Sequence, residues 1–272
     1  MAANASEAAP VAHHFNNLQQ QHEAVRLGMW LFLVTEVLFF GGAMCAYTAY
    51  RIWFPKEFEA GSAALNVGIA TVNTFLLLAS SLTVTLAVRA CYDGKQKLIQ
   101  FWLGTTIILG SLFLGLKARE YYLDFEEGLI PSRKLVASQA SHSSMIGEAA
   151  LGAAPKYAFV HNLEHVLHQA GYNTEGVDLF RVQLFFMFYY IMTGLHVIHM
   201  IVGIGLLGWQ FFLAKFGFFR FPARYIYIEV LSLYWHFVDM VWIFLLPLLY
   251  LAGPHNLGQV ITGLQQAFGI SH

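Results

Sequence analysis

Four side chains that can hold or share a proton recur on one face of a long apolar segment near the C-terminal end. The segment covers residues 225–251 and reads YIYIEVLSLYWHFVDMVWIFLLPLLYL. In a helix, positions i, i+3, i+7 and i+10 share one stripe, and here these positions hold Glu229, Ser232, His236 and Asp239. A charged side chain at the centre of a membrane helix costs about 2.5–3.5 kcal/mol. We therefore expect the stripe to face other protein or a polar cavity.

A carboxyl group also lies inside the first long apolar segment, residues 26–53. Glu36 stands well inside it, in the sequence RLGMWLFLVTEVLFFGG. Ionisable side chains inside a membrane are functional candidates, because their burial is costly. Glu36 is therefore either a protonated group that hydrogen-bonds to a neighbouring helix, or a site that carries protons or senses lipid. Gly41, Gly42 and Ala46 have the spacing of small residues that predicts close contact with another helix.

Two histidines occur inside the fourth long apolar segment, residues 179–213. His196 and His199 share one helix face. Histidines three apart on one helix cannot ligate opposite sides of one haem. We favour hydrogen bonds to the stripe of the last segment, with a b-type haem between either histidine and His236 as the alternative. The sequence thus predicts an interhelical polar cluster, whose members are Asn73, His196, His199, Glu229, His236 and Asp239.

A third set of histidines lies in the polar stretch 123–178. The string VHNLEHVLH sets His161, His165 and His168 at i, i+4 and i+7, on one face of a short helix. Zinc sites use such spacing, but no fourth ligand is evident and the HExxH motif is absent. We favour a solvated amphipathic helix and predict no metal site, with zinc as the alternative.

The segments that position these side chains are those of an integral membrane protein. Of 272 residues, 57% are hydrophobic and 11% are charged, whereas soluble domains carry about 25% charged residues. The apolar runs are continuous rather than alternating, which predicts helices. The net charge of −1 provides no basic stripe for a nucleic-acid partner. Cys45 and Cys91 lie in or beside apolar segments, where a lone thiol acts as a small apolar residue.

We predict an all-α integral membrane protein, a bundle of five transmembrane helices with a long extracytoplasmic loop between the third and the fourth. The helices are expected at residues 26–53, 64–90, 98–116, 179–213 and 225–251. The expected layout is a cytoplasmic polar tail (1–25), helices one to three (26–122), an extracytoplasmic loop (123–178), helices four and five (179–252) and an extracytoplasmic tail (253–272).

The charges near the helix ends set the expected orientation and the end of the third helix. Six Lys and Arg residues lie in the short loops after helices two and four or in the adjoining helix turn. By the positive-inside rule these loops and the N-terminus are cytoplasmic, and the C-terminus is outside. The string KAREYY, residues 117–122, is expected to mark the exit of the third helix at the membrane interface.

Five stretches in this order resemble subunit III of the haem-copper terminal oxidases, most closely the five-helix bacterial cytochrome c oxidase form. They are RLGMWLFLVTEVLFFGG (26–42), NTFLLLASS (73–81), EYY (120–122), TGLHVIHMIVG (193–203) and YWHFVDMVW (234–242). Mitochondrial forms typically have seven helices, of which this chain has the equivalent of the last five. Cys45 stands where those forms often have tryptophan, and the 123–178 stretch is longer than the family's.

The resemblance implies a chain without a redox centre of its own, with haem and copper held by partner subunits I and II. It implies docking beside the catalytic subunit, phospholipid held in a cleft, and support of proton uptake, in a proton-pumping complex of the bacterial inner membrane. A small subunit IV is a further possible partner. Glu36 resembles the family's carbodiimide-reactive glutamate, and Arg26 and Arg224 are candidates for lipid phosphate contact.

Cytochrome c is the expected electron donor, and a quinol oxidase subunit III is the close alternative. A stand-alone b-type membrane cytochrome, or a proton-coupled transporter that uses Glu36 and the stripe, would belong to other classes of protein. Neither accounts for five family-like stretches in order.

Overall fold

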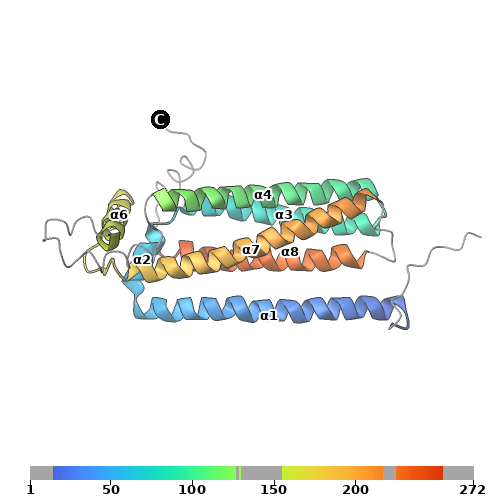
Figure 1. The fold of residues 1–272 in the computed structure, drawn as a ribbon, viewed down its shortest axis with the longest axis horizontal. Coiled ribbons are helices and arrows are strands. Elements are labelled where there is room, and N and C mark those ends of the chain that lie inside the picture. The colour runs from blue at the N-terminus through green and yellow to red at the C-terminus, as the bar shows by residue number, and fades with distance from the viewer. Residues whose placement is uncertain (1–14, 127–128, 130–154, 217–224, 254–272) are drawn as a thin grey trace, which may run out of the picture. The chain divides into compact units, whose positions relative to one another are not determined.

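The computed structural model describes residues 15–126, 129, 155–216 and 225–253. In these residues every regular element is a helix, and five helices are long and apolar enough to cross a membrane (Figure 1). They are α1 (Leu18–Trp53), α3 (Val67–Tyr92), α4 (Gln96–Glu126), α7 (Val182–Lys215) and α8 (Ile226–Leu245), which continues as the π-helix η2 (Leu246–Tyr250). The predicted fold class is confirmed. Two shorter helices are α2 (Pro55–Ala63) and α6 (Pro155–Gln169).

The first helix begins eight residues before the expected position, at Leu18 rather than Arg26. Asn17 provides the reason, because its side-chain oxygen accepts a hydrogen bond from the backbone N–H of Gln20 at 2.7 Å. A capping residue of this kind satisfies a free N–H group of the first helical turn. Part of the expected polar tail is therefore helical.

The chain contacts divide into two compact units, and each long helix contributes a stretch to both. The first unit contains residues 1–41, 74–114 and 196–242, and the second contains residues 42–73, 115–195 and 243–272. Each unit has its own buried core.

The core of the first unit forms around Trp235 of α8, which is fully buried. Its indole N–H donates to the Ser80 hydroxyl of α3 at 3.0 Å. A Cβ atom at Gly110 of α4 would lie 2.9 Å from the indole ring, and one at Gly203 of α7 would lie 3.0 Å from it. Both helices approach the ring at a glycine, because a larger residue would displace it.

The core of the second unit is aromatic and centres on Tyr47 of α1. This side chain is fully buried, and its ring contacts those of Phe58 in α2 and Phe185 in α7. Its hydroxyl donates to the carbonyl of Leu248 at 2.9 Å. Carbonyls in the last turn of a helix lack intrahelical partners, so Tyr47 satisfies one of them at the end of η2.

One packing prediction is wrong. A Cβ atom added at Gly41 or Gly42 would meet no atom within 4 Å. The close helix contact expected at these small residues is therefore not made within the described part of the chain.

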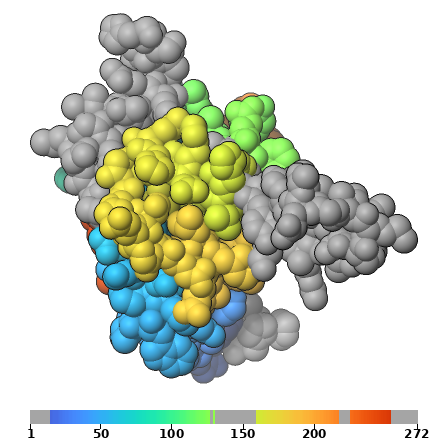
Figure 2. Space-filling model, turned by 90° about the vertical axis from the view of Figure 1, so that its left-hand side faces the viewer, coloured from blue at the N-terminus to red at the C-terminus, as the bar shows by residue number. Residues whose placement is uncertain are grey.

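The short helix predicted around the third set of histidines is present as α6. Leu163 and Leu167 are fully buried, and the ring of Phe159 contacts that of Phe186 in α7. Figure 2 shows the segment that contains α6 (yellow) beside α2 (blue) and the start of α7. Tyr172, in the turn after α6, is partly buried near the α2 carboxylates, and this burial raises its pKa above the ordinary tyrosine value.

Candidate functional site

An apolar groove of about 410 Å³ lies between α1, α7 and α8 in the first unit. Its walls are aliphatic and aromatic side chains, among them Val25, Met29 and Phe32 of α1, Val202 and Leu206 of α7, and Val230 of α8. Four polar side chains interrupt this lining: His199, Gln210, Tyr227 and Tyr234. A groove of this composition suits a hydrocarbon chain better than a polar molecule.

The intramembrane carboxyl of Glu36 lies beside this groove. Its Oε2 is 3.2 Å from Nε2 of His199, which lines the groove. The two side chains are about one-fifth exposed, 20% and 18% respectively. The Phe40 ring packs edge-on against the imidazole, and the hydroxyl of Tyr234 donates to the backbone carbonyl of His199. A carboxyl and an imidazole in contact can share a proton, and His199 of this pair lines the groove.

A second charged pair lies near the start of α1 and the start of α8. Arg26 donates to Glu229 Oε2 at 3.0 Å and to the Tyr225 hydroxyl at 3.3 Å, and the Tyr92 hydroxyl also donates to Glu229. The guanidinium Nε of Arg26 has no hydrogen-bond partner among the described residues. Arg26 directly follows Val25 of the groove wall. This Nε is buried, although 38% of the Arg26 side chain is exposed.

The middle of the α8 stripe faces α3. His236 Nδ1 lies 2.7 Å from the Ser81 hydroxyl, and its Nε2 lies 3.2 Å from Ser232 and 3.3 Å from Thr85. Asp239 is 3% exposed and has Ser81 as a polar neighbour. Neither side-chain oxygen of Asp239, however, has a hydrogen-bond partner among the described residues.

The six residues predicted as one polar cluster are divided among separate contacts. His199 pairs with Glu36, Glu229 with Arg26, and His236 with Ser81. His196 is buried between the rings of Phe113 and Trp242, and Asn73 is buried without a side-chain hydrogen bond to any described residue. The stripe residues make separate contacts because they lie at different heights along α8. Glu229 and His236 are about 10 Å apart along the axis, at 1.5 Å per residue.

Comparison with known proteins assigns the chain to a family. The family model for cytochrome c oxidase subunit III matches residues 4–126 and 142–254, which is most of the chain. The chain belongs to the cytochrome c oxidase subunit III family. The resemblance seen in the sequence is therefore confirmed.

Relatives of this subunit III occur in oxidases with different donors. The chain is 27% identical to the probable cytochrome c oxidase subunit 3 of Rickettsia bellii, over 84% of this chain and 69% of the relative. It is 28% identical to cytochrome c oxidase subunit 3 of Bacillus subtilis, over 84% and 86%. It is 24% identical to cytochrome bo(3) ubiquinol oxidase subunit 3 of Pseudomonas aeruginosa, over 91% and 94%. The chain is thus a multi-pass membrane subunit of a terminal oxidase complex, in a family without redox centres of its own, and its partners are oxidase subunits I and II.

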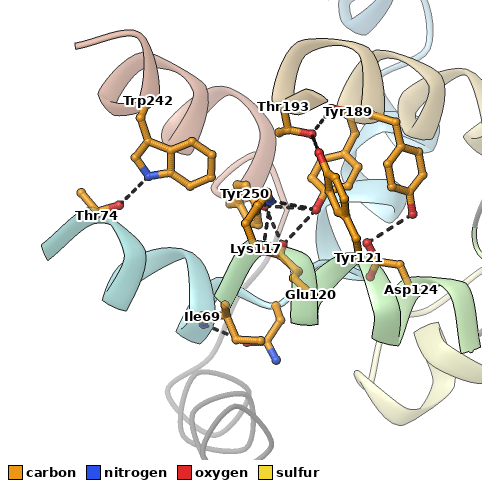
Figure 3. Close-up of polar contacts among 12 residues, drawn as sticks. Ile69, Thr74, Lys117, Glu120, Tyr121, Asp124, Tyr189, Thr193, Trp242 and Tyr250 are labelled. Carbon is orange, nitrogen blue, oxygen red and sulfur yellow. Dashed lines mark hydrogen bonds and ion pairs between the residues drawn. The ribbon is translucent and has the colours of Figure 1, made fainter. Parts of the chain in front are cut away.

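The second unit of this subunit III contains a buried charge network that the sequence analysis missed (Figure 3). Lys117 and Glu120 of α4 are 1% and 2% exposed, and Nζ lies 3.0 Å from the carboxylate. Lys117 also donates to the hydroxyls of Tyr189 and Tyr250, at 3.1 and 2.5 Å. Both hydroxyls in turn donate to Glu120, at 2.9 and 2.6 Å. The ammonium lies within 5.3 Å of three tyrosine ring centroids, those of Tyr121, Tyr189 and Tyr250.

This network explains why α4 continues to Glu126 instead of ending near Leu116 as expected. The charges at 117 and 120 were interpreted as marks of the membrane interface. They neutralise each other one turn apart on the same helix, so they need no contact with water. The available signal was the i, i+3 spacing of opposite charges directly after an apolar run.

The α6 histidines are exposed, as the favoured sequence interpretation predicts. His161, His165 and His168 all lie on the solvent side of α6. In the described part of the chain no group of three or more His, Cys, Asp or Glu side chains is placed to hold a metal ion together. Arg224, the second candidate for lipid contact, lies outside the described residues.

Proposed function

We propose that this chain is the non-catalytic subunit III of a proton-pumping cytochrome c oxidase in aerobic electron transport. In this role it stabilises the catalytic subunit, holds phospholipid and supports proton uptake. The observation that carries the proposal is the apolar groove with the Glu36–His199 pair at its wall. Cytochrome c is the donor we propose, because the TEVLFFGG segment around Glu36 resembles the cytochrome c branch of the family.

The groove is proposed to hold an acyl chain of a membrane phospholipid. Its lining is apolar, and Arg26 beside Val25 supplies a cation close to one end of the lining. The partly exposed Arg26 side chain supplies a cation for a lipid phosphate, while the contact with Glu229 fixes the guanidinium. Arg224 is proposed as a second phosphate contact on the same side, from its position just before α8.

Glu36 is proposed as the proton-related, carbodiimide-reactive carboxyl. It is partly accessible, it has a proton-sharing partner in His199, and it lies beside a groove that an apolar reagent can enter. Four members of the predicted polar cluster, Asn73, His196, His236 and Asp239, are proposed to join helices rather than to carry protons.

We also propose the placement of the chain in a bacterial inner membrane. The N-terminal tail would be cytoplasmic, and the segment between α4 and α7, together with the C-terminal tail, would be periplasmic. The support is the charge bias of the short loops. A small subunit IV would be a further partner in the complex.

The first test is to tag this chain, extract it gently from native membranes and record the reduced-minus-oxidised spectrum of the material that co-purifies. The expected haem signal follows a separate large subunit and is lost when this chain is isolated. Oxidation of reduced cytochrome c, but not of quinol, by the purified complex would identify the donor. Haem retained by the isolated chain would overturn the proposal and would indicate haem ligands among His196, His199 and His236.

A second test addresses the lipid. Val202→Trp places a large ring in the groove, whereas Ile201→Trp adds the same ring on an exposed position outside its lining. Mass spectrometry of the intact complex is expected to show loss of tightly bound phospholipid and faster inactivation during turnover in the first variant, with little change in the second. Equal lipid retention in both variants would remove the groove as the lipid site.

A further inference from the structure

The solvent face of α6 carries three histidines and one glutamate that the oxidase function above does not use. His161, Glu164, His165 and His168 are all exposed. At about 100° per residue they fall within an arc of about 100° around the helix. The opposite face is buried through Phe159, Leu163 and Leu167. The helix therefore presents its imidazoles as one row to solvent.

Two of these histidines have the spacing of a metal-binding pair. His161 and His165 are one turn apart, where Cβ atoms on a helix are about 5–6 Å from each other. Histidine pairs at i, i+4 ligate a single zinc ion in helical motifs. The string His161-x-x-Glu164-His165 also places a carboxylate between the two imidazoles in the order of the H-x-x-E-H motif.

The side chains of His161 and His165 are available to bind an ion, and the helix that carries them has a well-defined end. No hydrogen bond or ion pair with another described residue engages the side chains of His161 or His165. The end of α6 is closed by two backbone bonds, from Gly171 N–H to the His168 carbonyl and from Tyr172 N–H to the Leu167 carbonyl, with Gly171 at a φ of 71°. This pattern is the Schellman motif, which sets the end of a helix firmly. Ordered ligand positions lower the cost of binding.

We propose that His161 and His165 of α6 bind one divalent transition-metal ion of the zinc, copper and nickel class. These ions prefer imidazole nitrogen, unlike Mg²⁺ or Ca²⁺. Because no third protein ligand is placed to join them among the described residues, water completes the coordination, with Glu164 beside it. The ion is therefore exchangeable rather than a permanent part of the fold. The site does not depend on the identity of the electron donor.

The test uses the whole purified complex, prepared with a tag that contains no histidine and stripped of loosely bound metal. Zn²⁺ binding is measured by equilibrium dialysis for the wild type and for His161→Gln, His165→Gln and His168→Gln. Sites on partner subunits are common to all four proteins and cancel in the comparison. We expect His161→Gln and His165→Gln each to lose one equivalent of Zn²⁺. The matched control His168→Gln, which has no histidine four residues away, is expected to retain it.

A second measurement needs no variant. Zn²⁺ is expected to protect His161 and His165 of the wild-type complex from diethyl pyrocarbonate, with His168 modified at an unchanged rate, as read by peptide mass spectrometry. Equal loss of Zn²⁺ in all three variants would indicate a patch that depends only on the number of imidazoles, and would overturn the paired site. Unchanged Zn²⁺ binding in all three variants, or no protection by Zn²⁺, would overturn it as well.

Discussion

The buried network of Lys117, Glu120, Tyr189 and Tyr250 makes a quantitative prediction for the variant Lys117→Met. Methionine keeps much of the length of the side chain but removes the ammonium, so the Glu120 carboxylate loses its counter-charge while it stays buried. Removal of one partner from a buried ion pair costs about 3–5 kcal/mol. Both tyrosine hydroxyls can still donate to Glu120, at 2.9 and 2.6 Å. The expected loss is therefore at the lower end, about 3 kcal/mol.

The double variant Lys117→Met/Glu120→Leu tests whether the unpaired charge is the cause. With both charges removed, no ion remains buried, and replacement of a buried pair by apolar residues is often neutral or stabilising. The hydroxyls of Tyr189 and Tyr250 lose an acceptor but lie 3.2 Å apart, so one can donate to the other. The double variant is therefore expected to be more stable than Lys117→Met alone, with strongly non-additive effects.

The assay is the fraction of this subunit that stays with the purified oxidase complex after graded heating in mild detergent. A loss of about 3 kcal/mol corresponds to a roughly 150-fold shift of an equilibrium. Lys97→Met is the matched control, because Lys97 is exposed in the first turn of the same helix. If Lys117→Met were retained as well as Lys97→Met, or if the double variant were the least stable of the set, the argument from buried charge would be refuted.

Three further predictions concern single side chains. Glu36→Gln is expected to abolish carbodiimide labelling of this subunit in an assembled complex. The control Glu23→Gln, which changes an exposed carboxyl in α1, is expected to leave labelling unchanged. Label that persists in Glu36→Gln, mapped by mass spectrometry, would place the reactive carboxyl elsewhere. Gly203→Ala is expected to cost about 1–3 kcal/mol of stability, because its Cβ would lie 3.0 Å from the Trp235 ring. Gly205→Ala, whose Cβ would meet no atom within 4 Å, is expected to have little effect on thermal unfolding of the complex. Equal melting temperatures of the two variants would contradict this. Asp239→Leu is expected to lower the yield of assembled complex, because Ser81 loses its buried polar neighbour. A normal yield would remove the packing role assigned to Asp239.

The long apolar segments and the family were predictable because their signals are local. Continuous apolar runs and motifs such as YWHFVDMVW depend on neighbours in the chain. The start of α1 does not follow from the apolar pattern, because Asn17 caps a first turn that is polar.

The pairing of polar side chains could be predicted only in part. A helix period shows that Glu229 and His236 share a stripe, but not that Arg26 contacts one and Ser81 the other. These contacts join residues some 155 to 203 positions apart in the chain. Such pairings depend on helix register, which no local pattern determines.

The number of partners separates polar groups that hold the fold from those that can react. Lys117 and Glu120 are almost fully buried, and each uses its charge on the other and on two tyrosine hydroxyls. Proton exchange there would have to break several hydrogen bonds in a site without access to solvent. Glu36 has the same residue type as Glu120, but it is one-fifth exposed, has one contact to His199 and lies beside a groove. A partly exposed carboxyl with few partners is open to a reagent from outside, whereas the buried Glu120 is not, which is why Glu36 rather than Glu120 is the reactive candidate.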